Sequence, residues 1–376
     1  MTGHGPVGVA VVGCGTVSHQ YLPTLITSPD LRVVACADLD LDRAGAVAAR
    51  YGVPHATDVP TALHHPDVEL VVNLTIPAAH DAVAGAAIAA GRHVYNEKPL
   101  SMDRESGGRL LAAAADAGVR VGGAPDTFLT AGTQAALAML AEGAIGIPQT
   151  ALLLLQSPGP ESWHESPEFL YQRGAGPLFD LGPYYLTALA SAFGPAGRVA
   201  AAGRRAFPHR TIGAGPRAGT SFPVEVPTHV TALVEFVAGQ VATLVFSFDS
   251  PLSRAGFLEI TGTTATLALP DPNGYDGQPR LRRATDDDWV PVPISGHRSG
   301  RGIGVVEMAR AIRLDRPHRA SGEQALHVLD LMMAIAEAAD TGGFVTVKSS
   351  FTPAAPLPSG WDPTVATTAA TSAGPT

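Results

Sequence analysis

Val7-Gly8-Val9-Ala10-Val11-Val12-Gly13-Cys14-Gly15-Thr16-Val17-Ser18 stands close to the start of the chain and decides its fold. The apolar run over residues 7–12 predicts a strand buried on both faces of a parallel sheet. A glycine-rich turn follows, and residues 18–28 are expected to form a helix. The next strand is expected over residues 31–37, and it ends at Asp38, about 20 residues beyond Ser18.

This strand, turn and helix form a Gly-x-Gly-x-x-Ser version of the dinucleotide-binding fingerprint. Gly13 permits the tight turn, and Gly15 lets the backbone approach a pyrophosphate. The start of the helix, at Thr16 and Val17, offers free N–H groups and a positive dipole to that anion. Asp38 would accept hydrogen bonds from a ribose and repel a 2′-phosphate, so NAD is favoured over NADP. A bare turn could also use these glycines, but the strand, the spacing and the acid together favour nucleotide binding.

The use of lysine indicates a second site. Of the 25 basic residues only two are Lys, and one of them stands in Asn96-Glu97-Lys98-Pro99, just after an expected strand over residues 93–95. Arg stays protonated in proteins, whereas a Lys amine can be retuned and can exchange a proton. We therefore expect Lys98 to belong to a proton-handling site at the carboxyl end of a strand. The alternative interpretation is a loop lysine without a role.

Strand and helix patterns alternate up to about residue 125, which predicts a Rossmann domain with a doubly wound parallel sheet. Later segments have the period of two that is typical of strands, and two helices come near the end. These strands are expected over residues 228–237, 241–248, 256–261 and 264–269, and the helices over 305–313 and 323–339. We expect three parts: an NAD(P)-binding domain (1–125), an α+β domain for substrate binding and oligomerisation (126–350), and a disordered tail rich in Pro, Ala, Thr and Ser (351–376).

Composition narrows the choice of partners. The net charge of −9 and the absence of Lys/Arg runs argue against nucleic acid or an anionic membrane as partner. The apolar runs are far shorter than the roughly 20 residues of a membrane span. Cys14 and Cys36 are the only cysteines, and their spacing suggests neither a disulfide framework nor a metal site. We expect a cytoplasmic protein without a metal.

Four motifs follow one another along the chain. They are Gly13-Cys14-Gly15, Thr75-Ile76-Pro77-Ala78-Ala79-His80, Glu97-Lys98-Pro99-Leu100-Ser101 and Gly176-Pro177-Leu178-Phe179-Asp180-Leu181-Gly182-Pro183-Tyr184. In these motifs the chain, over roughly residues 6–350, resembles the glucose–fructose oxidoreductase/inositol dehydrogenase/rhizopine-catabolism (Gfo/Idh/MocA) family. The resemblance implies an NAD(P) Rossmann domain, a second domain on an open, mostly antiparallel sheet, and oxidation of sugar or polyol hydroxyls. It also implies that Lys98 lies beside the nicotinamide and the substrate.

The predicted cofactor contacts outside the glycine turn follow the ends of two strands. They are Thr75, Pro77, His80, Glu97 and Lys98. Because the carboxyl ends of parallel strands meet at one edge of a sheet, these residues are expected on the side where Gly13 and Gly15 would hold a dinucleotide.

The last motif departs from the family. Members commonly have Asp-x-Gly-x-His, with the His as acid/base, whereas this chain has Tyr184 at that place. A Tyr can serve if a cation such as Lys98 stabilises its phenolate. A helix that starts at Gly182 or Pro183 would direct Asp180 and Tyr184 into one cleft. The alternative interpretation is that Tyr184 packs at the domain interface.

Lys98, Asp180 and Tyr184 are thus the predicted catalytic residues. They are also predicted to contact the substrate, together with Trp163 and His164, which could offer a platform and a donor to a sugar ring; a solvated loop is the alternative for His164. Arg301 is assigned to the solvated surface, and contact with an anionic group of the substrate is the alternative. We expect a homo-oligomeric, NAD-dependent dehydrogenase that acts on a sugar, cyclitol or related polyol. Redox-assisted cleavage of a glycosidic bond with bound NAD, and a non-catalytic nucleotide-binding sensor, are the alternatives.

Overall fold

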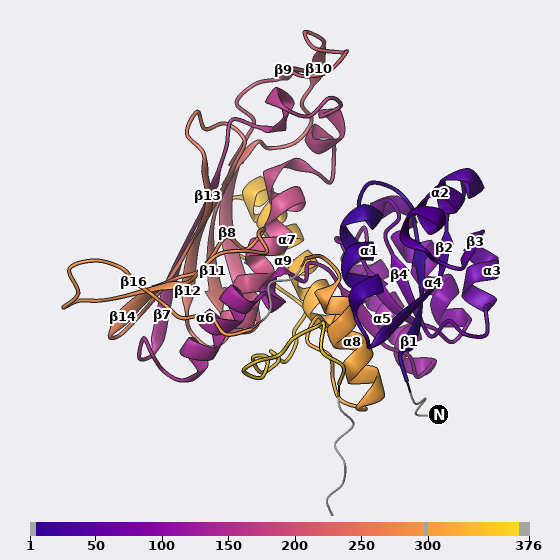
Figure 1. Cartoon of the computed structure of the whole chain (residues 1–376). Helices are drawn as coiled ribbons and strands as arrows, with labels where there is room; N and C mark the ends of the chain where they lie inside the picture. The colour runs from indigo at the N-terminus through magenta and orange to yellow at the C-terminus, as the bar shows by residue number, and fades with distance from the viewer. Residues whose placement is uncertain (1–4, 297–299, 368–376) are drawn as a thin grey trace, which may run out of the picture.

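The computed structural model describes residues 5–296 and 300–367, which form two regions, each built on its own sheet (Figure 1). The strands of the first sheet are β1 (Val7–Val12), β2 (Leu31–Ala37), β3 (His55–Thr57), β4 (Leu70–Asn73), β5 (His93–Asn96) and β6 (Val121–Gly123). They are all parallel and lie in the order β3-β2-β1-β4-β5-β6. This confirms the predicted doubly wound sheet, whose strand order reverses between β1 and β4, the place where such folds bind ligands.

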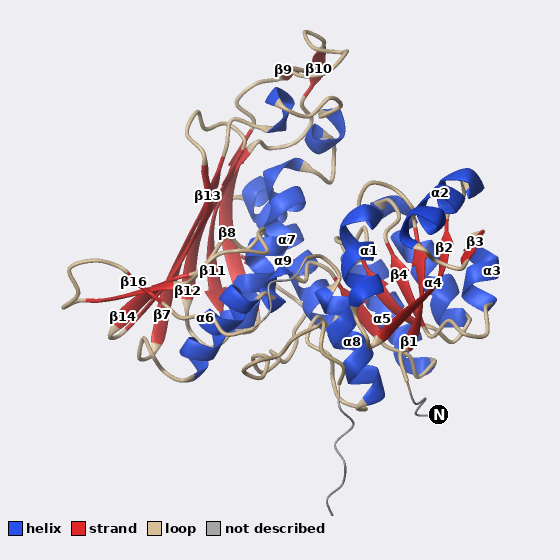
Figure 2. Ribbon diagram, viewed as in Figure 1, coloured by secondary structure: helices blue, strands red, loops and turns tan. Residues whose placement is uncertain are grey.

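Helices flank both faces of this sheet (Figure 2). They are α1 (Ser18–Thr27), α2 (Leu41–Tyr51), α3 (Val59–His64), α4 (His80–Ala89), which follows the 3-10 helix η1 (Pro77–Ala79), and α5 (Arg104–Asp116). The sequence did not predict β3 and α3, because three and six residues are too short to show a period.

Within the described residues, the second sheet has nine strands. They are β7 (Pro148–Gln156), β8 (Ala196–Arg204), β11 (His229–Phe236), β12 (Val241–Ser247), β13 (Arg254–Gly262), β14 (Ala265–Ala268), β15 (Arg280–Arg283), β16 (Val290–Pro291) and β17 (Val345–Thr346). Their order is β16-β15-β14-β13-β7-β12-β11-β8-β17, and every neighbouring pair is antiparallel except β7 with β12. The expected open, mostly antiparallel sheet is confirmed.

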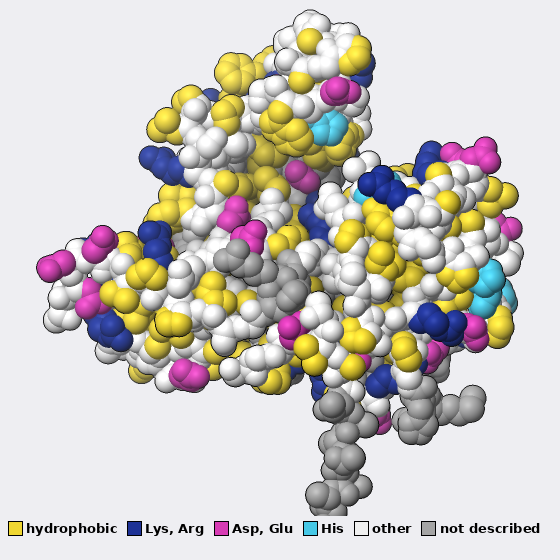
Figure 3. Space-filling model, in the orientation of Figure 1, with side chains coloured by type: hydrophobic (Ala, Val, Ile, Leu, Met, Phe, Trp, Pro, Cys, Tyr) yellow, Lys and Arg dark blue, Asp and Glu magenta, His cyan; other side chains and the backbone are white. Residues whose placement is uncertain are grey.

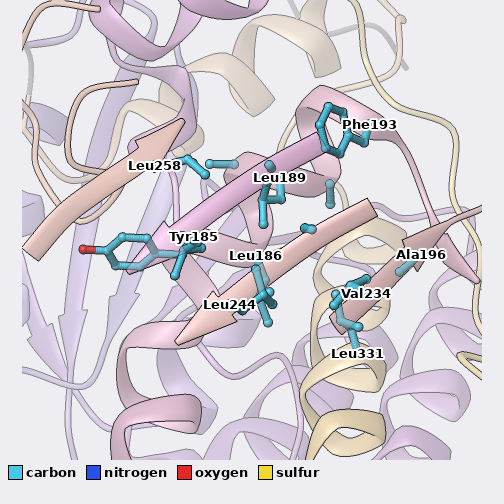
Figure 4. Close-up of a cluster of buried hydrophobic side chains, with 14 of the residues drawn as sticks. Tyr185, Leu186, Leu189, Phe193, Ala196, Val234, Leu244, Leu258 and Leu331 are labelled. Atoms are coloured by element: carbon cyan, nitrogen blue, oxygen red, sulfur yellow. The ribbon is translucent and has the colours of Figure 1, made fainter. Parts of the chain in front are cut away.

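Three helices cover one face of the second sheet: α6 (Ala131–Ala141), which follows the 3-10 helix η2 (Thr127–Leu129), α7 (Gly176–Phe193) and α9 (Gly322–Thr341). In Figure 4, Tyr185, Leu186 and Leu189 of α7 lie among side chains of the sheet and of α9, such as Leu244 and Leu331. This core holds α7 rigidly, which matters because α7 carries Asp180 and Tyr184.

A small arm extends from the second sheet at the top of Figure 1. It contains the 3-10 helices η3 (Pro160–Ser162) and η4 (Glu168–Tyr171) and the hairpin of β9 (His209–Thr211) and β10 (Ser221–Pro223). Its own small core includes Tyr171 and Phe222, and the buried Arg210 pairs with Glu161 and Asp249. This ion-paired core gives the arm a defined shape.

Late parts of the chain return to the first region. Helix α8 (Ile303–Arg313) contributes Ile303 and Met308 to the apolar cluster under β1, although the predicted boundaries assign it to the second domain. Residues 351–367 were predicted to begin a disordered tail, but they lie along the protein: Arg310 donates to the carbonyl oxygens of Asp362 and Val365 over 2.8 and 2.6 Å. The rest of the predicted tail, 368–376, lies outside the described residues. The domain boundaries at 125 and 350 stay predictions.

Candidate active site

The two glycines of the turn after β1 are glycine for different reasons. Gly13 has φ +95°, and a Cβ there would lie 2.7 Å from the carbonyl group of Leu74. At Gly15, by contrast, a Cβ would meet no atom within 4 Å. The protein itself therefore requires glycine only at position 13, whereas the bare backbone at position 15 fits the close approach of a pyrophosphate.

The start of α1 also fits an anion. No side chain caps the helix at Val17, and its first turn contains no acidic residue. Thr16 is exposed beside Gly15. The positive end of the helix dipole is thus left open to a ligand at the place where the fingerprint predicts the phosphates.

Asp38 lies at the end of β2, against the glycine turn. Its carboxylate accepts the N–H of Cys14 over 2.7 Å and that of Asp40 over 3.0 Å. Next to it, Leu39 is 97% exposed, and Ile76 at the end of β4 is 69% exposed. Two bare apolar side chains at the carboxyl edge of one sheet suit the faces of an adenine ring, so the residues present fit a dinucleotide.

Thr75, Pro77 and His80 surround the turn after β4. The Thr75 hydroxyl donates to Asn73 Oδ1 over 2.7 Å, and Pro77 opens η1. His80 is fully buried, with Nδ1 2.7 Å from the Pro99 carbonyl oxygen and Nε2 3.0 Å from that of Thr75. His80 therefore joins the turn after β4 to the Lys98-Pro99 segment from behind.

Glu97 is directed into the protein. Its carboxylate accepts the N–H of Lys98 and the hydroxyl of Tyr21, both over 2.8 Å, and Arg301 Nη1 lies 3.2 Å away. The residue predicted to contact the cofactor is thus placed as a buried anchor for its neighbours.

Lys98 and Asp180 come together from the two regions. Lys98 Nζ donates to Asp180 Oδ1 over 3.1 Å and to the Asp180 carbonyl oxygen over 2.9 Å. Burial lowers the pKa of Lys98, but Asp180, Tyr184 and Glu97 raise it by more, so the net shift is upward. At neutral pH Lys98 is an ammonium ion: it can polarise an oxygen but is not a base.

Tyr184 lies one helical turn after Asp180, so both side chains project from the same side of α7. Its hydroxyl oxygen accepts a hydrogen bond from Arg301 Nη2 over 2.9 Å, and Lys98 Nζ lies 5.6 Å from its ring centroid. Burial raises the pKa of Tyr184, and Glu97 adds to this, although Lys98 and Arg301 oppose it. The phenol is therefore protonated at neutral pH.

The predicted start of α7 at Gly182 or Pro183 was wrong. The helix begins at Gly176, with Pro177 in its first turn, and Pro183 lies inside it. A proline does stand in the first turn of the helix, as the rule for helix starts predicts, but it is Pro177 and not Pro183. As a result Asp180 sits in the second turn and not at the positive end of the helix.

Arg301 lies against Glu97 and Tyr184, a place that the sequence offered only as the alternative. The sequence favours the solvated surface for this residue, yet its side chain is only 18% exposed and bridges Glu97 and Tyr184. Burial acts to lower its pKa, but Tyr184, Tyr275 and Glu97 raise it by more. The only local signal is its place between glycines directly before α8, which no general rule connects with a site.

Trp163 and His164 lie in the arm. Trp163 is 68% exposed, and the His164 ring lies between Trp163 and Phe169, with ring centroids 5.5 and 5.4 Å away. Their ring contacts are thus made within the arm and not with Lys98. Figure 3 shows the surface indented between the arm and the first region.

The described residues contain neither a cluster of metal ligands nor a helix that could span a membrane. Over residues 5–296 and 300–367, no three or more His, Cys, Asp or Glu side chains are grouped to hold a metal ion. Within the same ranges, every helix is too short or too polar to cross a bilayer.

The fold, together with the bare backbone at Gly15 and the open start of α1, is that of a two-domain NAD(P)-binding oxidoreductase. Two family models then give the family: "Oxidoreductase family, NAD-binding Rossmann fold" matches residues 7–123, and "GFO/IDH/MocA C-terminal domain" matches residues 133–268. The chain belongs to the Gfo/Idh/MocA oxidoreductase family, as its motifs predicted.

Several known proteins are similar along most of their length. The 1,5-anhydro-D-fructose reductase of Ensifer adhaerens is 26% identical over 90% of this chain and 98% of its own. Trans-1,2-dihydrobenzene-1,2-diol dehydrogenase of Oryctolagus cuniculus is 27% identical over 70% of this chain and 75% of its own. An NAD-binding oxidoreductase from Klebsiella pneumoniae shares the fold with a TM-score of 0.81, at 23% identity over 92% of this chain and all of its own. Levoglucosan dehydrogenase in complex with NADH and L-sorbose shares it at 0.77, with 21% identity over the same shares.

Proposed function

We propose that this protein is an NAD(P)-dependent dehydrogenase that interconverts a hydroxyl and a carbonyl group on a sugar, cyclitol or related polyol, with NAD as the favoured cofactor. The observation that carries this proposal is the contact of Lys98 with Asp180 at the carboxyl edge of the first sheet, the edge that also holds Gly15 and Asp38. A non-catalytic sensor would not need an ammonium and a carboxylate paired there. The sugar and diol substrates named for similar proteins support the substrate class.

Each of the three residues has a proposed role. When bound, the nicotinamide ring supplies or takes up the hydride. Lys98 donates a hydrogen bond to the reacting oxygen and stabilises the negative charge that develops on it. Asp180 holds Lys98 in place and accepts a hydrogen bond from a neighbouring hydroxyl. Tyr184, protonated at rest, gives its proton to the oxygen when a carbonyl is reduced, and takes it back in the oxidation.

Cofactor and substrate contacts are proposed from position. Gly13, Gly15, Thr16, Val17 and Asp38 would hold the pyrophosphate and ribose, with Thr75 and Pro77 beside them. His80 and Glu97 would act indirectly, since their polar atoms bind the protein. Trp163 and His164 would reach a sugar ring from the arm.

The protein is further proposed to be a cytoplasmic homo-oligomer. Both cysteines are free and buried, which suits a reducing compartment. The face of the second sheet away from α7 carries two rows of side chains that run across neighbouring strands. They are Leu233, Thr243 and Leu152 in one row and Val245, Leu154 and Phe257 in the next. Glu259 continues the first row beside Leu152, and the apolar side chains of the two rows would pack against the same face of a second copy.

The test uses the only two lysines of the chain. The wild type, Lys98→Ala and Lys348→Ala proteins are incubated with NAD or NADP and a panel of sugars and polyols, and NADH formation is followed at 340 nm. We expect Lys98→Ala to lower kcat by about 10²–10³-fold, with NADH binding, read by fluorescence, retained. Lys348→Ala should match the wild type. Near-normal turnover of Lys98→Ala would contradict the role of Lys98, and release of an aglycone without net NADH would indicate glycosidic cleavage instead.

A further inference from the structure

We propose that Arg301 is a positioning residue that directs the Tyr184 hydroxyl toward the substrate and sets its acidity. This inference rests on the proposed function for its biological meaning, but its first test needs neither substrate nor cofactor. Arg301 reaches the site from the loop before α8, 117 residues beyond Tyr184.

The direction of one hydrogen bond fixes the orientation of the phenol. A guanidinium group has only donors, so Arg301 Nη2 donates and the Tyr184 oxygen accepts over 2.9 Å. The hydrogen of Tyr184 therefore cannot point at Arg301. Lys98, the other cation beside the ring, is likewise a donor only. Neither cation can accept the phenol hydrogen. A substrate oxygen bound near Lys98 could accept it.

Arg301 is itself held from two sides. Its Nη1 lies 3.2 Å from Glu97 Oε1, and the hydroxyl of Tyr21 donates to the same oxygen. Directly after it, the N–H groups of Gly302 and Gly304 donate to the buried Asp126 over 2.8 and 3.1 Å. The guanidinium is therefore positioned before any ligand binds, which is what a group that acts through a neighbour requires.

The charges that face Tyr184 determine its acidity. They come from the end of β5 (Glu97 and Lys98), from its own helix (Asp180) and from Arg301. When Tyr184 gives its proton to a substrate oxygen, its O–H bond breaks and a phenolate remains, which later regains a proton from solvent. Arg301 favours that phenolate both by charge and by a charge-assisted hydrogen bond. Loss of Arg301 should therefore make Tyr184 a weaker acid.

The direct test places 3-fluorotyrosine at position 184 and follows its ionisation by ¹⁹F NMR in the free protein. Relative to the wild type, Arg301→Gln should raise the pKa of the label by one unit or more, and Arg301→Lys by less. Arg32→Gln removes an exposed Arg that pairs with Asp67, and should leave the label unchanged. An unchanged label in a folded Arg301→Gln protein, as judged by its thermal unfolding, would overturn the proposal.

Arg301→Lys carries the same test if the Gln variant does not fold. One ammonium group lacks the two-armed fork that joins Glu97 to Tyr184, so the pKa of the label must still rise. If it does not, the proposal fails.

Kinetics provide the second readout once a substrate is known. Arg301→Gln should lower kcat at least tenfold at neutral pH and move the limb of the pH–rate profile that belongs to Tyr184 upward, with KM for NAD unchanged. A loss of kcat without a shift of that limb would contradict the proposal. If no substrate is turned over, the proposed function fails, yet the NMR titration still decides the role of Arg301.

Discussion

Of the two glycines after β1, Gly13 is required for folding and Gly15 is proposed to be required for cofactor binding, and substitutions can test this difference. Gly13→Ala should lower the free energy of unfolding by more than about 2 kcal/mol, because a positive φ and the Leu74 carbonyl both oppose a Cβ. Gly15→Val should change it by less than about 0.5 kcal/mol, since its Cβ meets open space. We expect NADH affinity, measured by fluorescence titration, to fall at least tenfold in Gly15→Val. A destabilised Gly15→Val protein, or one that binds NADH normally, would contradict this assignment.

The sequence predicted those site residues whose signal is local or compositional. Lys98 was found because lysine is rare in this chain, and Asp38 because its spacing from the glycine turn follows a rule. Arg301 was assigned to the surface because its partner Glu97 is 204 residues away, and no spacing rule connects them. The buried orientation of Glu97 was hidden for the same reason.

At the scale of elements, the pairing of β5 with the start of β6 depends on an uncharged histidine. His93 Nδ1 accepts the N–H of Arg120 over 2.9 Å, and burial, assisted by Arg120, lowers the pKa of His93 to about 4. The unfolded chain, with a pKa near 6.5, binds the proton first, so stability is lost as the pH falls below about 6.5. Between pH 7 and 5 the wild type should lose about 1–2 kcal/mol more than His93→Asn, whose amide oxygen can accept the same hydrogen bond.

Denaturant unfolding of both proteins at each pH measures this difference. All other titratable groups are the same in both proteins, so their effects cancel in the comparison. Parallel curves for the two proteins would show that His93 is not the acid-sensitive group.

The accuracy of the predicted elements followed their periodicity. Strands β1 and β2 occupy the predicted residues, because apolar runs mark them clearly. For helix α7 only a start at Gly182 or Pro183 was considered and no full range was predicted, because the helix is apolar nearly all round, as expected for a helix buried between a sheet and other helices. Strand β8 was missed because its Ala and Gly residues have little preference for strands.

For the whole molecule, the open face of the second sheet is the surface that association should use. Leu152 and Leu233 are both exposed, and they flank Thr243 on the strand between theirs. We expect Leu152→Glu combined with Leu233→Glu to convert an oligomer into monomers in light scattering coupled to size exclusion. The control is Val237→Glu, a change at an exposed apolar residue in the β11–β12 turn. An unchanged mass for the double variant would place the interface elsewhere.

The packing of α8 under β1 has a consequence for how the protein is made. The N-terminus leaves the ribosome first, so β1 and the glycine turn emerge long before residues 303–313, which cover one side of the first sheet. For most of translation, Val9 and Val11 of β1 lack that cover. The nascent first domain is therefore a natural client for chaperones, and a fragment cut at residue 125 should be prone to aggregate, however complete its fingerprint looks in the sequence.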